Sequence, residues 1–461
     1  MWIKNNKWLL LVLLFGAICR SGFVFYFFSE FERDPDAYKQ IAENVASRGQ
    51  FGQRFGDSVV SQPTAFRPPL YPLTLSLFVT EIDESAGMAS EGLKVDEASV
   101  ALLHIILSVF TIFCAYLFAR QMKLCDFRSS LVALLVTLDP IGLRQSSLVM
   151  TETMAVFFAT LGLCLLGQVF QKRKERGMSL LYGLLCGLFS MCRPTFLIWG
   201  GLIFMALLLQ RFMDREDKSH HKWWTPVFFF CGIVLAITPW TVRNYFQFGK
   251  PIFATTHGGY TIYLGNNDSF YDYLRSGKSQ VWDGEKELRQ DVLDIREAST
   301  LRETKGGFEV DEVKKDRLYY DKAMEVIRRR PADFAYACFV RVVRFWSIVP
   351  NSKERGSRTQ TIIGMGSAFW YGLLFLAAIT GLSRIGKICF SCPEFRLRAL
   401  RQFMPAVLLV VAFQGLHLLY WSNMRMRAPL VAVIALLAVL SLVKSETLKK
   451  IGEDEAEKSK S

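Results

Sequence analysis

Long apolar blocks are the feature of this sequence that most limits the folds it can adopt. Eight of them are about 20 residues long, the length that a helix needs to cross a bilayer. They cover residues 8 to 29, 99 to 119, 129 to 148, 150 to 170, 225 to 243, 366 to 384, 402 to 421 and 428 to 444. A further apolar stretch, 178 to 210, is interrupted by Arg193 and Pro194, which suit a turn at an interface, so it predicts two helices. We therefore expect an all-α integral membrane protein with about ten transmembrane helices.

The charge of the chain favours a membrane topology over nucleic-acid binding. The formal net charge is +13 in a chain that is 51% hydrophobic, and Lys and Arg gather in short loops between apolar blocks, where they mark the cytoplasmic side. With ten spans these loops fall on one side, both termini are cytoplasmic, and two long loops, 30 to 98 and 244 to 365, lie outside. We expect residues 1–445 to form one membrane domain and residues 446–461 to form a polar cytoplasmic tail. No nucleic acid is expected as a partner.

Each long outer loop contains a run that is too short to span a bilayer. One follows Pro72 and is mostly apolar, and the other begins at Pro331 and alternates aromatic residues with Arg341 and Arg344. Proline suits the first turn of a helix. We expect both runs to form helices at the membrane interface.

Cysteine and glycine patterns exclude several classes of site. Most of the ten cysteines lie inside apolar blocks, where free thiols act as small hydrophobic groups. Cys389 and Cys392 have no second pair and no histidines nearby, so a zinc or redox role is not favoured. No glycine pattern of a nucleotide-binding loop is present in the sequence, which argues against a nucleotide donor.

Polar and charged residues near the helix ends gather on the predicted outer side. Such charges are costly unless they serve an ion pair, a metal or a substrate. Together they would form a cavity with carboxylates for a proton or a metal and with arginines for an anion. For each single arginine, contact with lipid headgroups stays an alternative. The residues are Asp34, Asp36, Glu152, Arg193, Arg243, Asn244, Arg425 and Arg427.

A carboxylate beside several arginines at a membrane surface suits transfer from an anionic, lipid-linked donor to a hydroxyl or an amine. The carboxylate removes the proton of the acceptor, and fixed cations stabilise the phosphate that leaves. The motifs, in their order, resemble the polytopic lipid-linked-sugar glycosyltransferases of the GT-C fold, in particular the glycosyltransferase family 39-like group of protein O-mannosyltransferases and the lipid A aminoarabinose transferase. The residues that carry the resemblance are Asp34-Pro35-Asp36-Ala37-Tyr38, Arg67-Pro68-Pro69-Leu70-Tyr71-Pro72, Asp139-Pro140, Thr151-Glu152-Thr153, Arg193-Pro194-Thr195, the run from Pro239 to Tyr245, and the run from Arg425 to Pro429.

The resemblance implies inverting transfer of a sugar from a polyprenyl phosphate to an extracytoplasmic protein, lipid or glycan. It also implies that an aspartate of the first outer loop is the catalytic base, and the spacing to Tyr38 favours Asp34 over Asp36. Glu152 matches an acidic position that binds the acceptor or a divalent cation in some relatives, and pairing with an arginine is the alternative. We expect the donor phosphate to bind Arg193, Arg243, Arg425 and Arg427, and the site to be lined by Tyr38, Arg67, Asn244 and His257.

The main alternative is a transporter or flippase of a lipid-linked saccharide. Such a protein places its polar residues at mid-membrane on broken helices, whereas these gather on one rim. The compact size and the short tail favour a bacterial inner membrane, with the active site facing outward.

Overall fold

The computed structural model describes residues 6–54, 61–81, 93–170, 176–213, 223–277, 282–304, 307–350 and 358–449. Within these ranges the chain is mainly helical, with three small antiparallel ribbons of two strands each. The predicted helical membrane fold is confirmed. Most of the predicted cytoplasmic tail, from residue 450 onward, lies outside the described residues.

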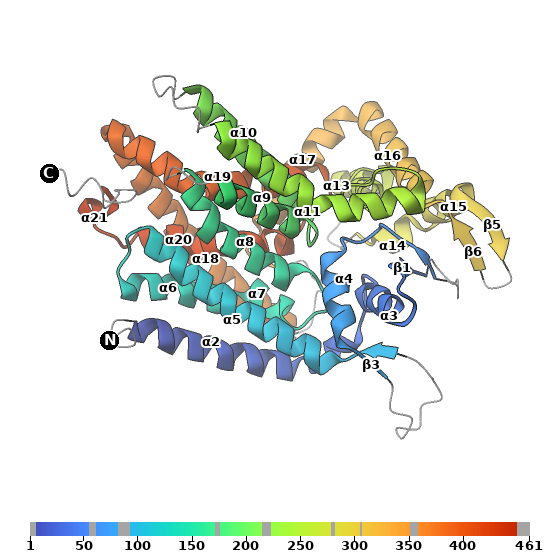
Figure 1. Cartoon of the computed structure of the whole chain (residues 1–461), viewed down its shortest axis with the longest axis horizontal. Helices are drawn as coiled ribbons and strands as arrows, with labels where there is room; N and C mark the ends of the chain where they lie inside the picture. Colours follow the sequence, from blue (N-terminus) through green and yellow to red (C-terminus); the bar gives the residue numbers. More distant parts are fainter. Residues whose placement is uncertain are drawn as a thin grey trace.

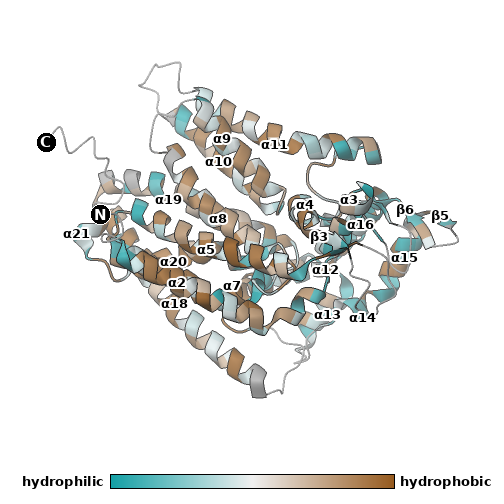
Figure 2. Cartoon of the chain, turned by 60° about the horizontal axis from the view of Figure 1, so that its bottom comes forward, coloured by the Kyte–Doolittle hydropathy of each residue, from teal (hydrophilic) through white to brown (hydrophobic). Residues whose placement is uncertain are grey.

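Apolar helices pack side by side into a bundle (Figure 1), and Figure 2 shows that the hydrophobic residues concentrate there. Six helices of the described chain are long and apolar enough to cross a membrane: α2, α5, α10, α11, α18 and α19. The helices of the bundle are α2 (Lys7–Tyr26), α5 (Glu97–Gln121), α6 (Asp126–Thr137), α7 (Pro140–Gln145), α8 (Glu152–Leu166), η4 (Gly167–Phe170), α9 (Arg176–Ser190), α10 (Thr195–Met213), α11 (Trp224–Phe248), α18 (Arg358–Ser391), α19 (Pro393–Leu419), η6 (Met424–Leu430), α20 (Val431–Leu440) and α21 (Ser445–Lys449).

Two predicted spans differ from the structure, while the predicted break at Arg193 is confirmed, since α9 ends before it and α10 begins after it. Residues 129 to 148 do not form one helix. Pro140 lacks an amide hydrogen and disfavours a helical conformation at Asp139, and the Asp139 carboxylate instead accepts a hydrogen bond from Gly142 N at 2.6 Å and starts α7. Residues 428 to 444 are likewise divided, between the 3-10 helix η6 and the short α20.

The two long loops fold into elements that gather at one end of the bundle, which we call the loop end (Figure 1). The start of α2 and all of α21 lie at the opposite end. Helix α17 begins at Pro331, as predicted. The elements of the loop end are η1 (Phe28–Glu32), α3 (Tyr38–Arg48), β1 (Gly52–Gln53), β2 (Gln62–Pro63), α4 (Leu70–Leu75), η2 (Ser76–Phe78), β3 (Val79–Glu81), β4 (Leu93–Val95), α12 (Gly258–Gly265), α13 (Asp268–Ser276), α14 (Gly284–Glu287), α15 (Arg289–Ser299), β5 (Thr300–Thr304), β6 (Gly307–Val310), α16 (Glu312–Arg329) and α17 (Pro331–Phe345).

A buried carboxylate ties the two long loops together. Glu312, in the first turn of α16, accepts hydrogen bonds from Thr64 Oγ1 at 2.6 Å and from Ala65 N at 2.8 Å, and a third from the Thr256 hydroxyl. Burial raises the pKa of Glu312, while these hydrogen bonds lower it. Because the donors come from both loops, Glu312 holds them in one layer over the bundle.

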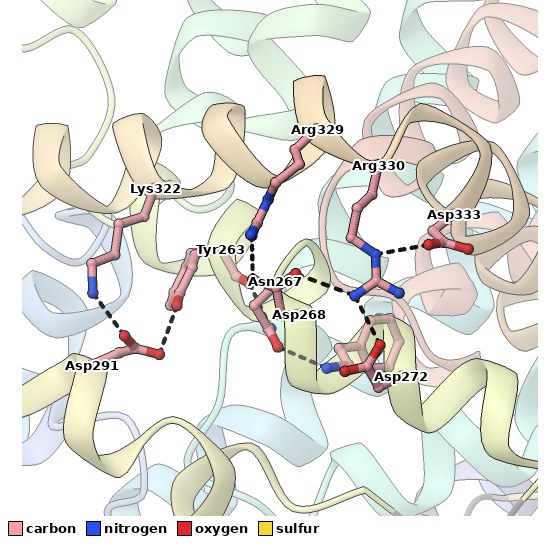
Figure 3. Close-up of polar contacts among 10 residues, drawn as sticks. Tyr263, Asn267, Asp268, Asp272, Asp291, Lys322, Arg329, Arg330 and Asp333 are labelled. Carbon is pink, nitrogen blue, oxygen red and sulfur yellow. Dashed lines mark hydrogen bonds and ion pairs between the residues drawn. The ribbon is translucent and has the colours of Figure 1, made fainter.

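The second loop also has a hydrophobic core and a polar frame of its own. The core includes Tyr263, Phe270 and Tyr319. Figure 3 shows the frame, in which Arg330 pairs with Asp268, Asp272 and Asp333 at distances of 2.8 to 3.2 Å. Exposed ion pairs contribute little free energy singly, but this network joins α13, α16 and the start of α17 at fixed positions.

Candidate active site

The first part of the site is the turn between η1 and α3. Asp34 Oδ2 accepts a hydrogen bond from the Gln40 amide at 3.0 Å, one of the amides in the first turn of α3 that have no partner within the helix. The other oxygen, Oδ1, is buried and has no hydrogen-bond partner among the described residues. Burial raises the pKa of Asp34 above its ordinary value, against the opposing effect of the α3 amides. A held carboxylate with one unengaged oxygen and a raised pKa has the properties of a general base.

Asp36 lies in the same turn but is already paired. Arg67 Nη2 is 2.7 Å from Asp36 Oδ1, and Arg67 Nε donates to the Asp36 carbonyl oxygen at 2.9 Å. The same guanidinium lies over the Tyr38 ring, 5.5 Å from its centre. Between the two, Ala37 has φ 59, a left-handed conformation that is uncommon for a residue with a side chain. Strain of this kind occurs at functional sites, and the sequence contains no signal for it.

The second part of the site is a carboxylate between two arginines. Glu152, at the start of α8, is 1% exposed, and its Oε1 lies 3.1 Å from Arg425 Nε and 3.6 Å from Arg193 Nη1. Arg193 occupies the break between α9 and α10, and Arg425 follows Asn423, whose side chain accepts a hydrogen bond from the Arg425 amide. Two positive charges face one negative charge, so the cluster carries a net charge of about +1. Glu152 Oε2 has no hydrogen-bond partner in the described part of the chain.

Tyr38 joins the two parts. Burial is the main reason that the pKa of Tyr38 is raised, and smaller effects come from four charged groups: Arg67, Asp36, Glu152 and Arg193. The Leu70 amide donates to the Met191 carbonyl oxygen at 2.9 Å. The segment that carries Arg67 and Tyr71 therefore lies against the chain that leads to Arg193, and the aspartate turn adjoins the Glu152 cluster. The structure therefore places Asp34, Asp36, Tyr38 and Arg67 in one part of this region and Glu152, Arg193 and Arg425 in the other.

Tyr38 packs against a buried pair, Tyr71 and His104, that the sequence pattern does not single out. The Tyr38 and Tyr71 rings meet edge to face at 5.2 Å, and the Tyr71 hydroxyl is 2.9 Å from His104 Nε2. His104 Nδ1 is 3.1 Å from the Ser146 carbonyl oxygen, which can only accept. The proton therefore sits on Nδ1, and Tyr71 donates to Nε2. This dyad fixes the ring on which Tyr38 packs.

Three other predicted residues are not brought to the Glu152 cluster. Arg243 donates to the carbonyl oxygens of Thr64 at 2.7 Å and Phe51 at 2.6 Å, and Asn244 donates to that of Ile252 at 2.9 Å. Arg243 thus holds the first loop against α11, and Asn244 holds the start of the second loop against the end of the same helix. Arg427 donates to the carbonyl oxygens of Phe345 and Ser347 and lies over the Tyr371 ring at 4.4 Å. The guanidinium groups of Arg243 and Arg427 thus each donate to two carbonyl oxygens of the chain.

His257 lies beside the aspartate turn rather than in it. Its ring meets Phe66 edge to face at 4.3 Å, and Phe66 stacks under Arg67. Burial, together with the positive charges of Arg67 and Lys315, lowers the pKa of His257 well below its ordinary value, so the ring is neutral. Its Nδ1 has no hydrogen-bond partner among the described residues.

The described side chains of the site do not offer a complete set of ligands for a divalent cation. Within the described ranges no group of three or more His, Cys, Asp or Glu side chains could hold a metal ion. Glu152 faces two arginines, and Asp36 faces one.

One protein-family model and several solved structures match this chain. Residues 59–255 match the family model described as dolichyl-phosphate-mannose-protein mannosyltransferase; this segment contains Arg67, Glu152 and Arg193. The oligosaccharyltransferase of Archaeoglobus fulgidus in the apo form superimposes with a TM-score of 0.51 at 16% identity, over 95% of this chain and 50% of that chain. The chain has the GT-C fold.

Two further structures are similar. The same oligosaccharyltransferase, tethered with an acceptor peptide containing the NVT sequon, gives a TM-score of 0.51 at 15% identity, over 96% of this chain and 50% of that chain. ArnT from Cupriavidus metallidurans bound to undecaprenyl phosphate gives a TM-score of 0.38 at 12% identity, over 95% of this chain and 78% of that chain. The chain spans about half the length of the oligosaccharyltransferase. No curated protein matches the sequence significantly.

Proposed function

We propose that this protein is a membrane glycosyltransferase that transfers a sugar from a polyprenyl-phosphate donor to an extracytoplasmic acceptor. The observation that carries the proposal is the meeting of two chemically distinct parts. Asp34 presents an unengaged carboxylate oxygen, and the adjoining Glu152 cluster has a surplus of positive charge. The GT-C fold and the mannosyltransferase family match over residues 59–255 support the same reaction class.

The proposed reaction is a single displacement at the anomeric carbon. Asp34 Oδ1 takes the proton of an acceptor hydroxyl or amine as its oxygen or nitrogen bonds to that carbon. The bond between the anomeric carbon and the phosphate oxygen breaks, and the polyprenyl phosphate leaves with the bonding electron pair. Arg193 and Arg425 stabilise the charge that develops on this phosphate. Attack opposite the leaving group inverts the configuration.

The remaining residues have supporting roles in this proposal. Asp36 holds Arg67, which in turn orients Tyr38 between the two parts of the site. Glu152 holds Arg193 and Arg425 and keeps their charges in place when no donor is bound. Arg243, Asn244 and Arg427 act as structural residues in this proposal, because each donates to at least one main-chain carbonyl oxygen.

The proposal includes a membrane orientation. Residues 1–445 form one membrane domain, and the loop end faces outward, so that the donor enters sideways from the outer leaflet of a bacterial inner membrane. The loop end is richer in hydrophilic residues than the bundle (Figure 2), as a region in water requires. A protein, a lipid or a glycan acceptor reaches Asp34 from that side.

Product analysis tests the proposal. The full chain in proteoliposomes is given a panel of radiolabelled polyprenyl-phosphate sugars together with protein, lipid and glycan acceptors, with and without a chelator. A transferase moves the label covalently to an acceptor and releases polyprenyl phosphate. A transporter would move the intact lipid-linked sugar across the bilayer, and that result without any transfer would overturn the proposal. Loss of transfer with chelator and its return on adding a divalent ion would show that a metal takes part.

A further inference from the structure

A row of aromatic rings leads away from the aspartate turn. It starts at Arg67, whose guanidinium lies 4.9 Å from the centre of the Phe66 ring. From Phe66 the ring centres follow at 4.3 Å to His257, 5.7 Å from there to Tyr260, and 5.4 Å from Tyr260 to Tyr319. The proposed reaction uses Arg67 but none of the rings beyond it.

The row borders a cavity of about 330 Å³. Phe66, Tyr260 and Tyr319 supply an apolar, aromatic side, and the charged groups on the other side are Glu285, Arg289 and Lys315. The volume is within the range of small-molecule sites, about 300 to 1,000 Å³. The cavity thus combines aromatic faces with both hydrogen-bond donors and an acceptor.

The walls of the cavity are held in place by bonds outside it. Lys322 of α16 pairs with Asp291 of α15 at 2.7 Å, and the Tyr263 hydroxyl of α12 donates to the same carboxylate at 2.7 Å (Figure 3). These contacts join the three helices that carry Tyr260, Arg289 and Tyr319. The cavity is therefore formed before any ligand arrives, which lowers the entropic cost of binding.

Two charged side chains in the cavity wall have no polar partner in the part of the chain that the structure describes. Among the described residues, no hydrogen bond or ion pair involves the side chains of Glu285 and Arg289. They come from α14 and the start of α15, and both are exposed. Side chains of opposite charge that line one cavity without pairing are available to a ligand.

The chemistry of the cavity selects among ligand classes. A simple anion would suit Arg289 and Lys315 but would be repelled by Glu285. A hydroxyl group both donates and accepts a hydrogen bond, so a polyhydroxylated ligand can bond to Glu285 and Arg289 together. The C–H face of a sugar ring suits an aromatic ring face, which carries partial negative charge.

We propose that this cavity binds the saccharide part of the acceptor and delivers it along the aromatic row to Asp34. The inference rests on the proposed function, because it makes the cavity the acceptor subsite of that reaction. It assigns substrate recognition to the second outer loop and chemistry to the first, with Arg67 and Phe66 at the junction. The acceptor is accordingly a glycan or a glycolipid rather than a peptide.

Saturation-transfer difference NMR on the full chain in nanodiscs tests the inference. The probes are neutral hexose and N-acetylhexosamine di- and trisaccharides, compared with serine- and threonine-containing peptides of similar mass. We expect at least one saccharide to bind, and Glu285→Ala and Arg289→Ala each to weaken its binding about tenfold or more, the loss expected for a hydrogen bond to a charged group. Arg317→Ala is the matched control, because that side chain is 80% exposed and pairs only loosely with Asp321, at 3.9 Å.

Binding of a labelled polyprenyl-phosphate sugar to the same samples separates the two proposals. Normal donor binding in Arg289→Ala, with weakened saccharide binding, supports the cavity as the acceptor subsite. Binding of peptides alone, no saccharide binding, or equal binding by Arg289→Ala and Arg317→Ala overturns the inference and leaves the transferase proposal standing. Absence of donor binding by the unaltered protein would count against the proposed function instead.

Discussion

Replacing Asp34 by asparagine separates its proposed role as a base from its role in the fold. The asparagine side chain keeps an oxygen that can accept from the Gln40 amide, the 3.0 Å bond that Asp34 makes. Asparagine and aspartate are similarly favourable acceptors at the start of a helix. The variant therefore keeps its fold but cannot take a proton from the acceptor.

The expected loss of transfer rate follows from the removal of this base. A positioned general base contributes about 10²- to 10⁴-fold to the rate, which equals about 2.7 to 5.5 kcal/mol of activation free energy. Asp36→Asn is the matched comparison, since it removes a carboxylate from the same turn but acts only through the ion pair with Arg67. In this pair the Arg67 side chain is 13% exposed and the Asp36 side chain is 25% exposed. We expect Asp36→Asn to lower the transfer rate less than about 10²-fold, because no proton-transfer group is lost.

The pH dependence adds an independent measurement. Because burial raises the pKa of Asp34, the transfer rate should rise with pH through a value above the ordinary one of about 3.9, and Asp34→Asn should lose this limb. Stability changes in the opposite direction. In that pH window the folded state binds more protons at Asp34 than the unfolded state does. The contribution of Asp34 to the free energy of unfolding is therefore lost as pH rises.

The assay is single-turnover transfer of labelled sugar from a polyprenyl phosphate, with a thermal melt of each variant in detergent. The reasoning is refuted if Asp34→Asn transfers sugar at the rate of the unaltered protein, or if Asp36→Asn loses more activity than Asp34→Asn while both melt normally. The second result would make Asp36 the base.

Three further predictions concern the rest of the site and the fold. Arg425→Ala should raise the donor KM about 10- to 100-fold, the cost of one hydrogen bond to a charged group. Arg33→Ala is the control and should leave the donor KM unchanged, because the Arg33 side chain is 73% exposed. Equal KM values for the two variants would show that Arg425 does not bind the donor phosphate. Glu312→Ala should lower the melting temperature, because each buried donor left unpaired costs about 1 to 3 kcal/mol; an unchanged melt would show that the two loops are held together by other contacts. Gly183→Ala should lower the free energy of unfolding by about 1 to 3 kcal/mol through overpacking, because an added Cβ would lie 1.9 Å from the Phe229 carbonyl oxygen. Gly177→Ala is the control and should melt normally, because an added Cβ there meets no neighbouring part of the described structure within 4 Å.

The comparison of the two arginine groups shows where sequence reasoning ends. Arg243 and Arg425 look alike in sequence, since each follows or precedes an apolar block at the predicted outer side. In the structure Arg425 faces Glu152, while Arg243 is bonded to the carbonyl oxygens of Thr64 and Phe51. Which carbonyl or carboxylate a guanidinium meets depends on chain segments that are far away in sequence.

The helix breaks show the same division. Arg193 and Pro194 predict a turn correctly because a charge and a proline both oppose a continuous membrane helix. Asp139 and Pro140 contain a similar signal, but the apolar residues around them favour a single span, and only the packed structure shows α6 and α7 as separate helices.

The sequence alone determined the membrane class, the two long loops and the set of charged residues at one rim, because hydropathy, proline and charge act locally along the chain. Tertiary structure decided which of these residues meet. It brought the aspartate turn next to Glu152, Arg193 and Arg425, and it placed Arg427 against the carbonyl oxygens of Phe345 and Ser347. It also formed the aromatic cavity from two loops that are distant in sequence, since such a cavity exists only when separate segments fold against each other.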